Sequence, residues 1–135
     1  MKLNVQIELK PDDINDILYT AFEGGVDYWC SGIVGSDGDL AQLPMNQMGI
    51  EYVYAHVGYG GKLEVYVQAN NNTAMILDRK NFQSGLQKWI DKNPNSVEVH
   101  YDYGNKYTTL DIGNIDAGDA DCIVQYALFG ELVYG

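Results

Sequence analysis

The sequence predicts a single α+β domain, in which an antiparallel β-sheet packs against about three helices. Some segments alternate apolar and polar residues, as half-buried strands do, and others repeat apolar residues at helical spacing. Pairs of strand-like segments also flank glycine turns, which favours antiparallel hairpins. A chain of 135 residues has the size of one domain, so we expect residues 1–135 to form a single unit.

The first elements follow from the local pattern of the chain. Residues 2–9 alternate apolar and polar side chains and predict a half-buried strand. Pro11, followed by two aspartates, is typical of the first turn of a helix. Gly24 and Gly25 are expected to end this helix. Its apolar stripe consists of Ile14, Ile17, Leu18, Ala21 and Phe22.

Further strands are expected in the middle of the chain. A strand that contains Trp29 is predicted over residues 26–34. Residues 50–57 and 62–69 flank a Gly-Tyr-Gly-Gly sequence, which predicts a β-hairpin. A short strand at 73–77 follows an asparagine-rich turn.

The second half of the chain predicts two helices and another hairpin. Asp78 is a suitable N-cap for a helix over residues 79–92. Residues 97–103 and 106–112 alternate around a Gly-Asn turn and predict a hairpin. Asp116 is the expected N-cap of the last predicted helix, at 117–129, and Gly130 is expected to end it. The large aromatic residues Trp29, Phe82 and Trp89 are expected in the core.

The last predicted helix is apolar on nearly all sides. Cys122, Tyr126 and Phe129 lie outside its main apolar stripe. Such a helix is either central to a domain or part of a subunit interface. The second alternative predicts self-association, most simply a homodimer, through these three residues.

The charge balance restricts the classes of partner. The chain has 19 acidic and 8 basic residues, a net charge of −11, and 11 tyrosines. Direct binding to nucleic acid is disfavoured, because that binding depends on clustered lysine and arginine. An acidic, tyrosine-rich surface suits a basic surface on another protein, although the charge could also serve solubility alone.

No catalytic, metal or cofactor site is expected. His56 and His100 fall in predicted strands without ligands at metal-binding spacing. Cys30 and Cys122 have apolar neighbours, which favours buried, reduced thiols in a cytosolic protein, although their spacing leaves a disulfide open. The polar run Asp111, Asn114, Asp116, Asp119 and Asp121 suggests calcium, but its spacing does not match a calcium-binding loop. Helix capping and the helix dipole better explain Asp116, Asp119 and Asp121. Because no catalytic constellation is found, a non-enzyme is expected. No signal peptide and no apolar run long enough to span a membrane is visible, so a cytoplasmic location is expected.

Two dense blocks of aromatic residues and glycines are the strongest motifs. The first is Glu-Gly-Gly-Val-Asp-Tyr-Trp-Cys at 23–30, and the second contains Gln-Tyr-Ala-Leu-Phe-Gly-Glu at 125–131. The second block runs from Asp119 to the end and begins with Asp-Ala-Asp at 119–121; between the blocks stand Gly-Gly-Lys-Leu at 60–63 and Gly-Asn-Ile-Asp-Ala at 113–117. In these motifs the chain resembles a family of small acidic proteins of phages, prophages and mobile elements of Firmicutes. The resemblance implies a bacterial host cytoplasm, and it transfers no reaction or site residue.

The genetic context implied by the resemblance favours an accessory protein that binds and inhibits a host defence protein, of anti-CRISPR or antirestriction type. Target binding is expected where the chain departs most from the family, at 40–49 and 97–107. Acidic side chains would mimic phosphates in a basic channel of the target. The candidate contacts are Asp37, Asp39, Glu51, Glu64, Glu98 and Asp102, with Tyr101, Tyr103 and Tyr107.

Two other functions are open at this stage. The protein could be an oligomeric sponge that sequesters a nucleotide immune signal, with aromatic rings that stack on the base and with Arg79 and Lys80 near the phosphates. It could also be a structural or regulatory phage protein, whose aromatic blocks form only core and interface.

Overall fold

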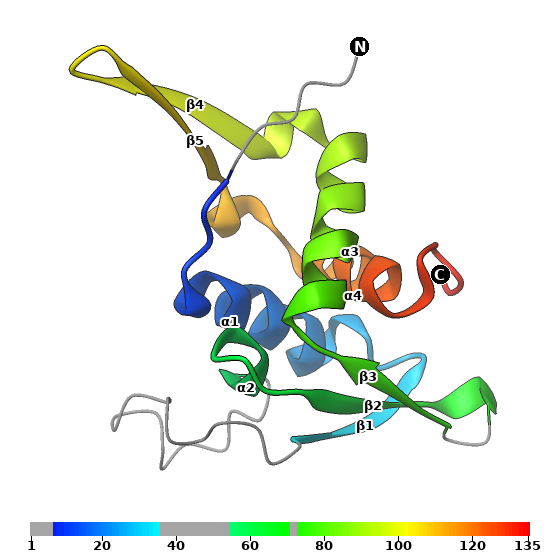
Figure 1. Cartoon of the computed structure of the whole chain (residues 1–135). Coiled ribbons are helices and arrows are strands. Elements are labelled where there is room, and N and C mark those ends of the chain that lie inside the picture. The colour runs from blue at the N-terminus through cyan, green and yellow to red at the C-terminus, as the bar shows by residue number, and fades with distance from the viewer. Residues whose placement is uncertain (1–6, 36–54, 71–72) are drawn as a thin grey trace.

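Helices occupy the middle of the molecule and separate two antiparallel sheets (Figure 1). The computed structural model describes residues 7–35, 55–70 and 73–135. The helices of this part of the chain are α1 (Pro11–Thr20), α2 (Ala55–Gly58), α3 (Arg79–Lys92) and α4 (Ala117–Phe129). The predicted α+β class with antiparallel sheets is confirmed.

The larger sheet lies under the helices. It contains β1 (Cys30–Gly35), β2 (Leu63–Val67) and β3 (Thr73–Leu77) in that order, with both neighbouring pairs antiparallel. The side chains of β2 alternate between a buried face and an outer face, which carries Glu64 and Tyr66. The sheet therefore presents its apolar face to the helices, and the predicted strand at 73–77 is confirmed as β3.

The predicted hairpin over 50–57 and 62–69 is wrong in its described part. Ala55–Gly58 is helical, and β2 pairs with β1 and β3 instead. A Cβ on Gly58 would lie 2.7 Å from the Pro11 carbonyl oxygen, so glycine allows this turn to pack closely on α1. Val57 is fully buried, so tertiary packing outweighs the strand propensity of these residues. Residues 50–54 lie outside the described residues.

The strand predicted at 26–34 begins later, at Cys30. The backbone amides of Trp29 and Cys30 both donate to the Val26 carbonyl, which makes a turn of the preceding residues. This turn follows α1 and the π-helical segment Ala21–Gly25, in which Gly24 has φ +149°. Glycine is suited to this left-handed conformation, so the predicted helix end is confirmed.

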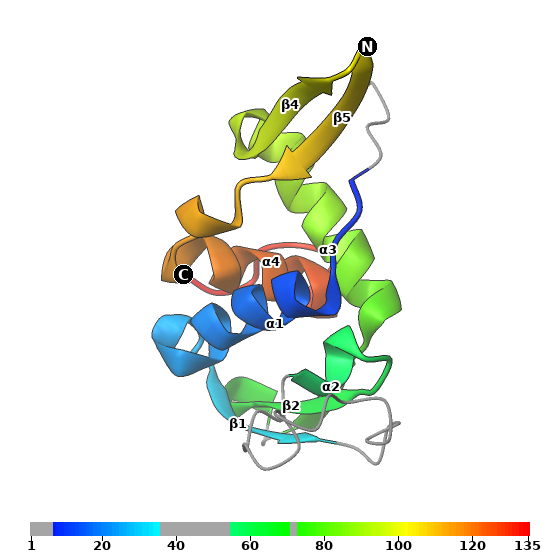
Figure 2. The ribbon, with the colours of Figure 1, turned by 90° about the vertical axis from the view of Figure 1, so that its left-hand side faces the viewer.

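The smaller sheet is the hairpin of β4 (Val97–Asp102) and β5 (Asn105–Leu110). It points away from the helices at the opposite end of the molecule from the larger sheet (Figures 1 and 2). Ile7 forms an isolated parallel bridge with Thr108 on the outer side of β5. That bridge is the described end of the strand predicted at 2–9, whose residues 2–6 lie outside the described residues.

Helix α4 is the centre of the core. It packs against α1, α3 and the Ala21–Gly25 segment, so its several apolar sides are covered within the chain. At the crossing with α3, a Cβ on Gly85 would lie only 2.4 Å from the Ala127 backbone nitrogen, so glycine permits the close approach. Of the two alternatives for this helix, the central position explains its composition. Tyr126 is buried in the chain, and self-association through Cys122, Tyr126 and Phe129 stays a prediction.

The caps of the two long helices agree with the sequence. Asp78 accepts from the Asn81 amide at the start of α3, and Asp116 accepts from the Asp119 amide at the start of α4. Gly130 ends α4 in the left-handed conformation. In the part of the chain that the structure describes, no helix is both long and apolar enough to cross a membrane.

Candidate functional site

The two aromatic-glycine blocks meet at the buried carboxylate of Asp121, which lies on α4. The Trp29 indole nitrogen donates to Oδ1 at 2.7 Å, and the Tyr28 hydroxyl donates to Oδ2 at 2.5 Å. Gln125, one turn further along α4, donates its Nε2 to Oδ1 at 2.9 Å. The assignment of Asp121 to the helix dipole is therefore incomplete: its carboxylate pairs with the first block, across more than 90 residues.

Gln125 also holds the segment that follows α4. Its Oε1 accepts from the backbone amides of Val133 and Tyr134, both at 2.9 Å, and its Nε2 donates to the Tyr134 carbonyl at 3.2 Å. The Tyr134 ring stacks on Trp29, with 5.7 Å between the ring centroids. We call this set of residues the structural lock: Tyr28, Trp29, Asp121, Gln125, Val133 and Tyr134. Its polar groups stabilise the fold, because they donate to and accept from one another within the chain.

The protonation states around this lock do not favour nucleophilic chemistry. Burial and the hydrogen bond to Asp121 raise the pKa of Tyr28 to about 12. Burial also raises the thiol pKa values of Cys30 and Cys122, so both thiols stay protonated at neutral pH. Both cysteines are free, and the disulfide that their spacing left open is not formed.

The sequence-predicted contacts divide into three groups. Asp37, Asp39 and Glu51 lie outside the described residues, as does the loop at 40–49. Glu64 lies on the larger sheet, where its carboxylate accepts from the Tyr66 hydroxyl at 3.1 Å. The structure brings the other five together on the β4–β5 hairpin, at the far end of the molecule from Glu64 (Figure 1). These five are Glu98, Tyr101, Asp102, Tyr103 and Tyr107.

The hairpin has two faces and a tip. Because cross-strand neighbours share a face, the register places Glu98, His100, Asp102 and Tyr107 on one face. His100 is fixed there by a 2.8 Å hydrogen bond to the Thr109 hydroxyl and by stacking on Tyr107. The other face carries Tyr101, which is 74% exposed, with Val99 and Lys106.

The tip of the hairpin carries Tyr103 in a strained conformation. Its φ is +48°, and Gly104, the next residue of the turn, has φ +79°. Asparagine and glycine suit the two central positions of such a turn, while a large aromatic residue is an outlier there. Tyr103 is 98% exposed, so no packing within the described structure offsets the strain. Among the described residues, therefore, no contact explains why a tyrosine occupies this turn position.

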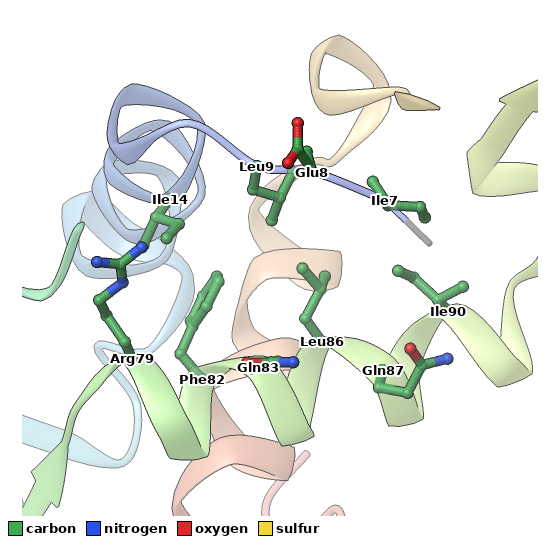
Figure 3. A pocket seen from close by; sticks show the side chains of 10 residues that line it. All are labelled: Ile7, Glu8, Leu9, Ile14, Arg79, Phe82, Gln83, Leu86, Gln87 and Ile90. Carbon is green, nitrogen blue, oxygen red and sulfur yellow. The ribbon is translucent and has the colours of Figure 1, made fainter. Parts of the chain in front are cut away.

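Sequence reasoning missed a groove between the N-terminal segment and α3. Its volume is about 480 Å³, and Figure 3 shows Leu9 pointing toward α3 and Glu8 pointing away. Arg79 lies at one end, so the structure does place one predicted phosphate-binding cation beside a pocket. Among the described lining residues the one aromatic side chain is that of Phe82, which is buried and not available to stack on a base. The apolar lining residues are Ile7, Leu9, Ile14, Phe82, Leu86 and Ile90.

The described residues include no group of three or more histidine, cysteine, aspartate or glutamate side chains that could hold a metal ion. His56 lies in α2 and not in the predicted strand, whereas His100 lies in β4 as predicted. Asp116 and Asp119 cap α4 reciprocally, which is the capping role expected for them.

No family model, curated protein or solved structure matches this chain. The resemblance to proteins of mobile elements therefore stays a prediction from the sequence motifs.

Proposed function

We propose that the protein is a non-enzymatic accessory protein that binds and inhibits a host defence protein, and that the β4–β5 hairpin is its contact element. The observation that supports this most is Tyr103. A fully exposed aromatic ring at a strained turn position is disfavoured by the fold, so a role outside the fold accounts for it best. Tyrosine is also a residue that protein interfaces favour.

The neighbours of Tyr103 indicate a basic partner surface. Glu98 and Asp102 share one face with Tyr107 and with His100, whose Nε2 lies 3.6 Å from the Glu98 carboxylate, and Lys106 lies on the other face. The face that carries Glu98 and Asp102 therefore combines two carboxylates with the aromatic ring of Tyr107. This combination suits the basic nucleic-acid channel of another protein. The net charge of −11 would favour the approach to such a partner.

The genetic context supports the choice of a defence protein as the target. It rests on the resemblance of the two aromatic-glycine blocks to proteins of mobile elements. In the structure these blocks form the internal lock around Asp121, far from the hairpin. We therefore propose that the blocks maintain the fold while the hairpin recognises the target.

The test is affinity purification of the tagged protein from a Firmicutes host, with mass spectrometry of bound proteins and small molecules. The key variant is Tyr103→Asn, because asparagine suits the left-handed turn position and leaves the hairpin intact. Ile76→Thr is the matched control, an exposed apolar residue on the larger sheet.

A defence protein that co-purifies with the unmodified chain and the control, but not with Tyr103→Asn, would support the proposal. We also expect salt to weaken the complex, because exposed charge pairs are screened. Retention of the target by Tyr103→Asn would refute the hairpin as the contact, and a bound nucleotide without a protein would favour the sponge.

A further inference from the structure

The hairpin also has an open backbone edge on β4. Among the described residues, β4 pairs only with β5. The Asp111 amide donates to the Ser96 carbonyl at 2.8 Å, which shows that Ser96, just before β4, turns its backbone groups toward the β5 side. Backbone groups alternate sides along a strand, so Glu98, His100 and Asp102 also face β5. Val97, Val99 and Tyr101 therefore direct their amides and carbonyls outward.

The other sheet edges in the described structure carry some protection. Ile7 bridges to Thr108 on the outer side of β5. The Ile76 carbonyl of β3 accepts from the Asn81 side chain at 2.6 Å, and the register of β1 shifts after Cys30. Proteins commonly protect edges with lysine, proline, bulges or covering segments. Among the described residues, β4 shows no bulge, no bridging segment and no side chain bonded to its outer edge, and it contains no lysine or proline, so this edge is suited to pairing with another strand.

We propose that two copies of the protein associate through this edge. The two β4 strands would run antiparallel and join the hairpins into one four-stranded sheet, with the two-fold axis at Val99. The inference goes beyond the proposed function, because it concerns an interface that needs no target. It places the second copy on the hairpin and not on α4.

Charge selects this register among the possible ones. With the axis at Val99, Glu98 lies opposite the partner's His100, and this pairing of a carboxylate with an imidazole occurs twice. Within one chain the His100 Nε2 already lies 3.6 Å from the Glu98 carboxylate, so the dimer would join two such pairs. An axis at His100 would place Glu98 opposite the partner's Asp102, and an axis at Glu98 would oppose two glutamates. Like charges directly opposite each other are unfavourable. An axis nearer either end of Val97–Asp102 shortens the paired segment.

The same register pairs the apolar residues of the opposite face. Val99 would meet the partner's Val99, and Val97 would meet the partner's Tyr101. Val99 is 49% exposed and Tyr101 is 74% exposed in the single chain, so pairing would bring two exposed apolar side chains into contact with the partner. Tyr103 stays at the tip in this arrangement, and the dimer would present two tips pointing in opposite directions.

The first experiment compares the mass of the protein in solution for the unmodified chain, Glu98→Lys, His100→Glu and an equimolar mixture of these two variants. Sedimentation velocity over a concentration series is the measurement, with circular dichroism to verify folding. In its own dimer, His100→Glu opposes two carboxylates, and Glu98→Lys removes the carboxylate that pairs with the partner's His100, so we expect at least a tenfold weaker association of each variant alone. The mixture restores opposite charges in both pairs, and we expect it to form a heterodimer as tight as the original dimer.

The second experiment fixes the register by a disulfide. Opposed residues of a hydrogen-bonded pair lie about 5.5 Å apart between Cα atoms, within the range that a disulfide bridges. Val99→Cys is expected to cross-link two copies on oxidation. The control is Lys106→Cys, whose side chain lies on the same face of the hairpin as Val99 but on β5, one strand further from the axis. Because it also retains the native Cys30 and Cys122 yet should not cross-link, it shows whether those two thiols contribute.

A monomeric unmodified chain at all concentrations would overturn the proposal. So would a dimer that neither charge variant weakens, which would move the interface elsewhere, for example to α4. Equal cross-linking of the two cysteine variants would overturn the register. These experiments contain no target protein, so a negative result would refute the dimer and not the proposed inhibition. The proposed inhibition is tested separately, by the affinity purification.

Discussion

The two sheets of this protein share one sequence pattern and differ in what covers them. In β2 of the larger sheet, Leu63, Val65 and Val67 are fully buried under the helices. In the hairpin, β4 alternates just as regularly, yet Val99 and Tyr101 stay exposed. Alternation thus predicts a strand, while the neighbouring helices decide which side chains are buried.

The difference separates stability from recognition. In the described structure the hairpin is anchored at its base, where Leu110 is buried and Val97 is half-buried, and by the bridge of Thr108 to Ile7. Its outer part contributes little to the core, so its side chains can change with little effect on folding. The helices and the larger sheet, by contrast, contain the lock around Asp121 and the close helix crossing at Gly85.

The largest expected effect is at Trp29. Trp29→Ala should lower the free energy of unfolding by about 4 kcal/mol, because it opens a cavity in the core and leaves Asp121 without its indole donor. Urea denaturation followed by circular dichroism measures the change. Tyr101→Ala on the hairpin is the control, and both variants are measured at a concentration at which the chain is monomeric, with an expected change for Tyr101→Ala within about 0.5 kcal/mol. If the two variants lost equal free energy of unfolding, the proposed difference in stability between the core and the hairpin would be wrong.

A smaller loss is expected at the helix crossing. Gly85→Ala improves helix propensity by about 1 kcal/mol, but its Cβ would overlap the backbone of Ala127. Overpacking against backbone outweighs the gain, and we expect a net loss of about 2 kcal/mol. Thermal unfolding compares it with Ser84→Ala, an exposed neighbour on α3. A stabilised Gly85→Ala would show that α3 and α4 can move apart at little cost.

The hairpin tip should respond in the opposite direction. Tyr103→Asn relieves the strain of a bulky residue at φ +48°, so stability should rise by up to about 1 kcal/mol. Tyr101→Asn, in the extended part of β4, should bring no such gain. The midpoint of thermal unfolding distinguishes the two. If Tyr103→Asn destabilised the fold, the ring would have a structural role and would no longer indicate recognition.

The smallest effect concerns alkaline pH. The folded state raises the pKa of Tyr28 from its ordinary value of 10.0 to about 12, so it favours the neutral phenol. The resulting stabilisation is complete below pH 10 and disappears as the pH rises through 12. Tyr28→Phe cannot ionise, and between these pH values it should lose less stability than the unmodified chain. The difference should be small, because Tyr28 is half-exposed.

The parts of the fold that were predictable depend on local chemistry. Asp78, Asp116 and Gly130 are helix-end signals that act within a few residues, so α3 and α4 begin and end where expected. The turn before β1 and the short helix α2 depend on partners far along the chain. Trp29 reaches Asp121, 92 residues away, and no local pattern announces that contact.

The candidate site shows the same limit. Alternation and the turn sequence were enough to place Tyr101, Tyr103 and Tyr107 on one hairpin. The groove was missed because it forms between Leu9 on the N-terminal segment and Leu86 on α3, which no sequence spacing connects. Glu64 was grouped with the hairpin by charge alone, and the topology separates them.

The distance along the chain between Trp29 and its partner has a consequence for biosynthesis. Ribosomes add about 5–20 residues per second, so the 92 residues that separate Trp29 from Asp121 take roughly 5–20 s to translate. During that time the indole lacks its hydrogen-bond acceptor and the ring that stacks on it. Completion of the core must therefore wait until α4 has left the exit tunnel, and a nascent chain stalled before that point would expose the indole to chaperones and proteases.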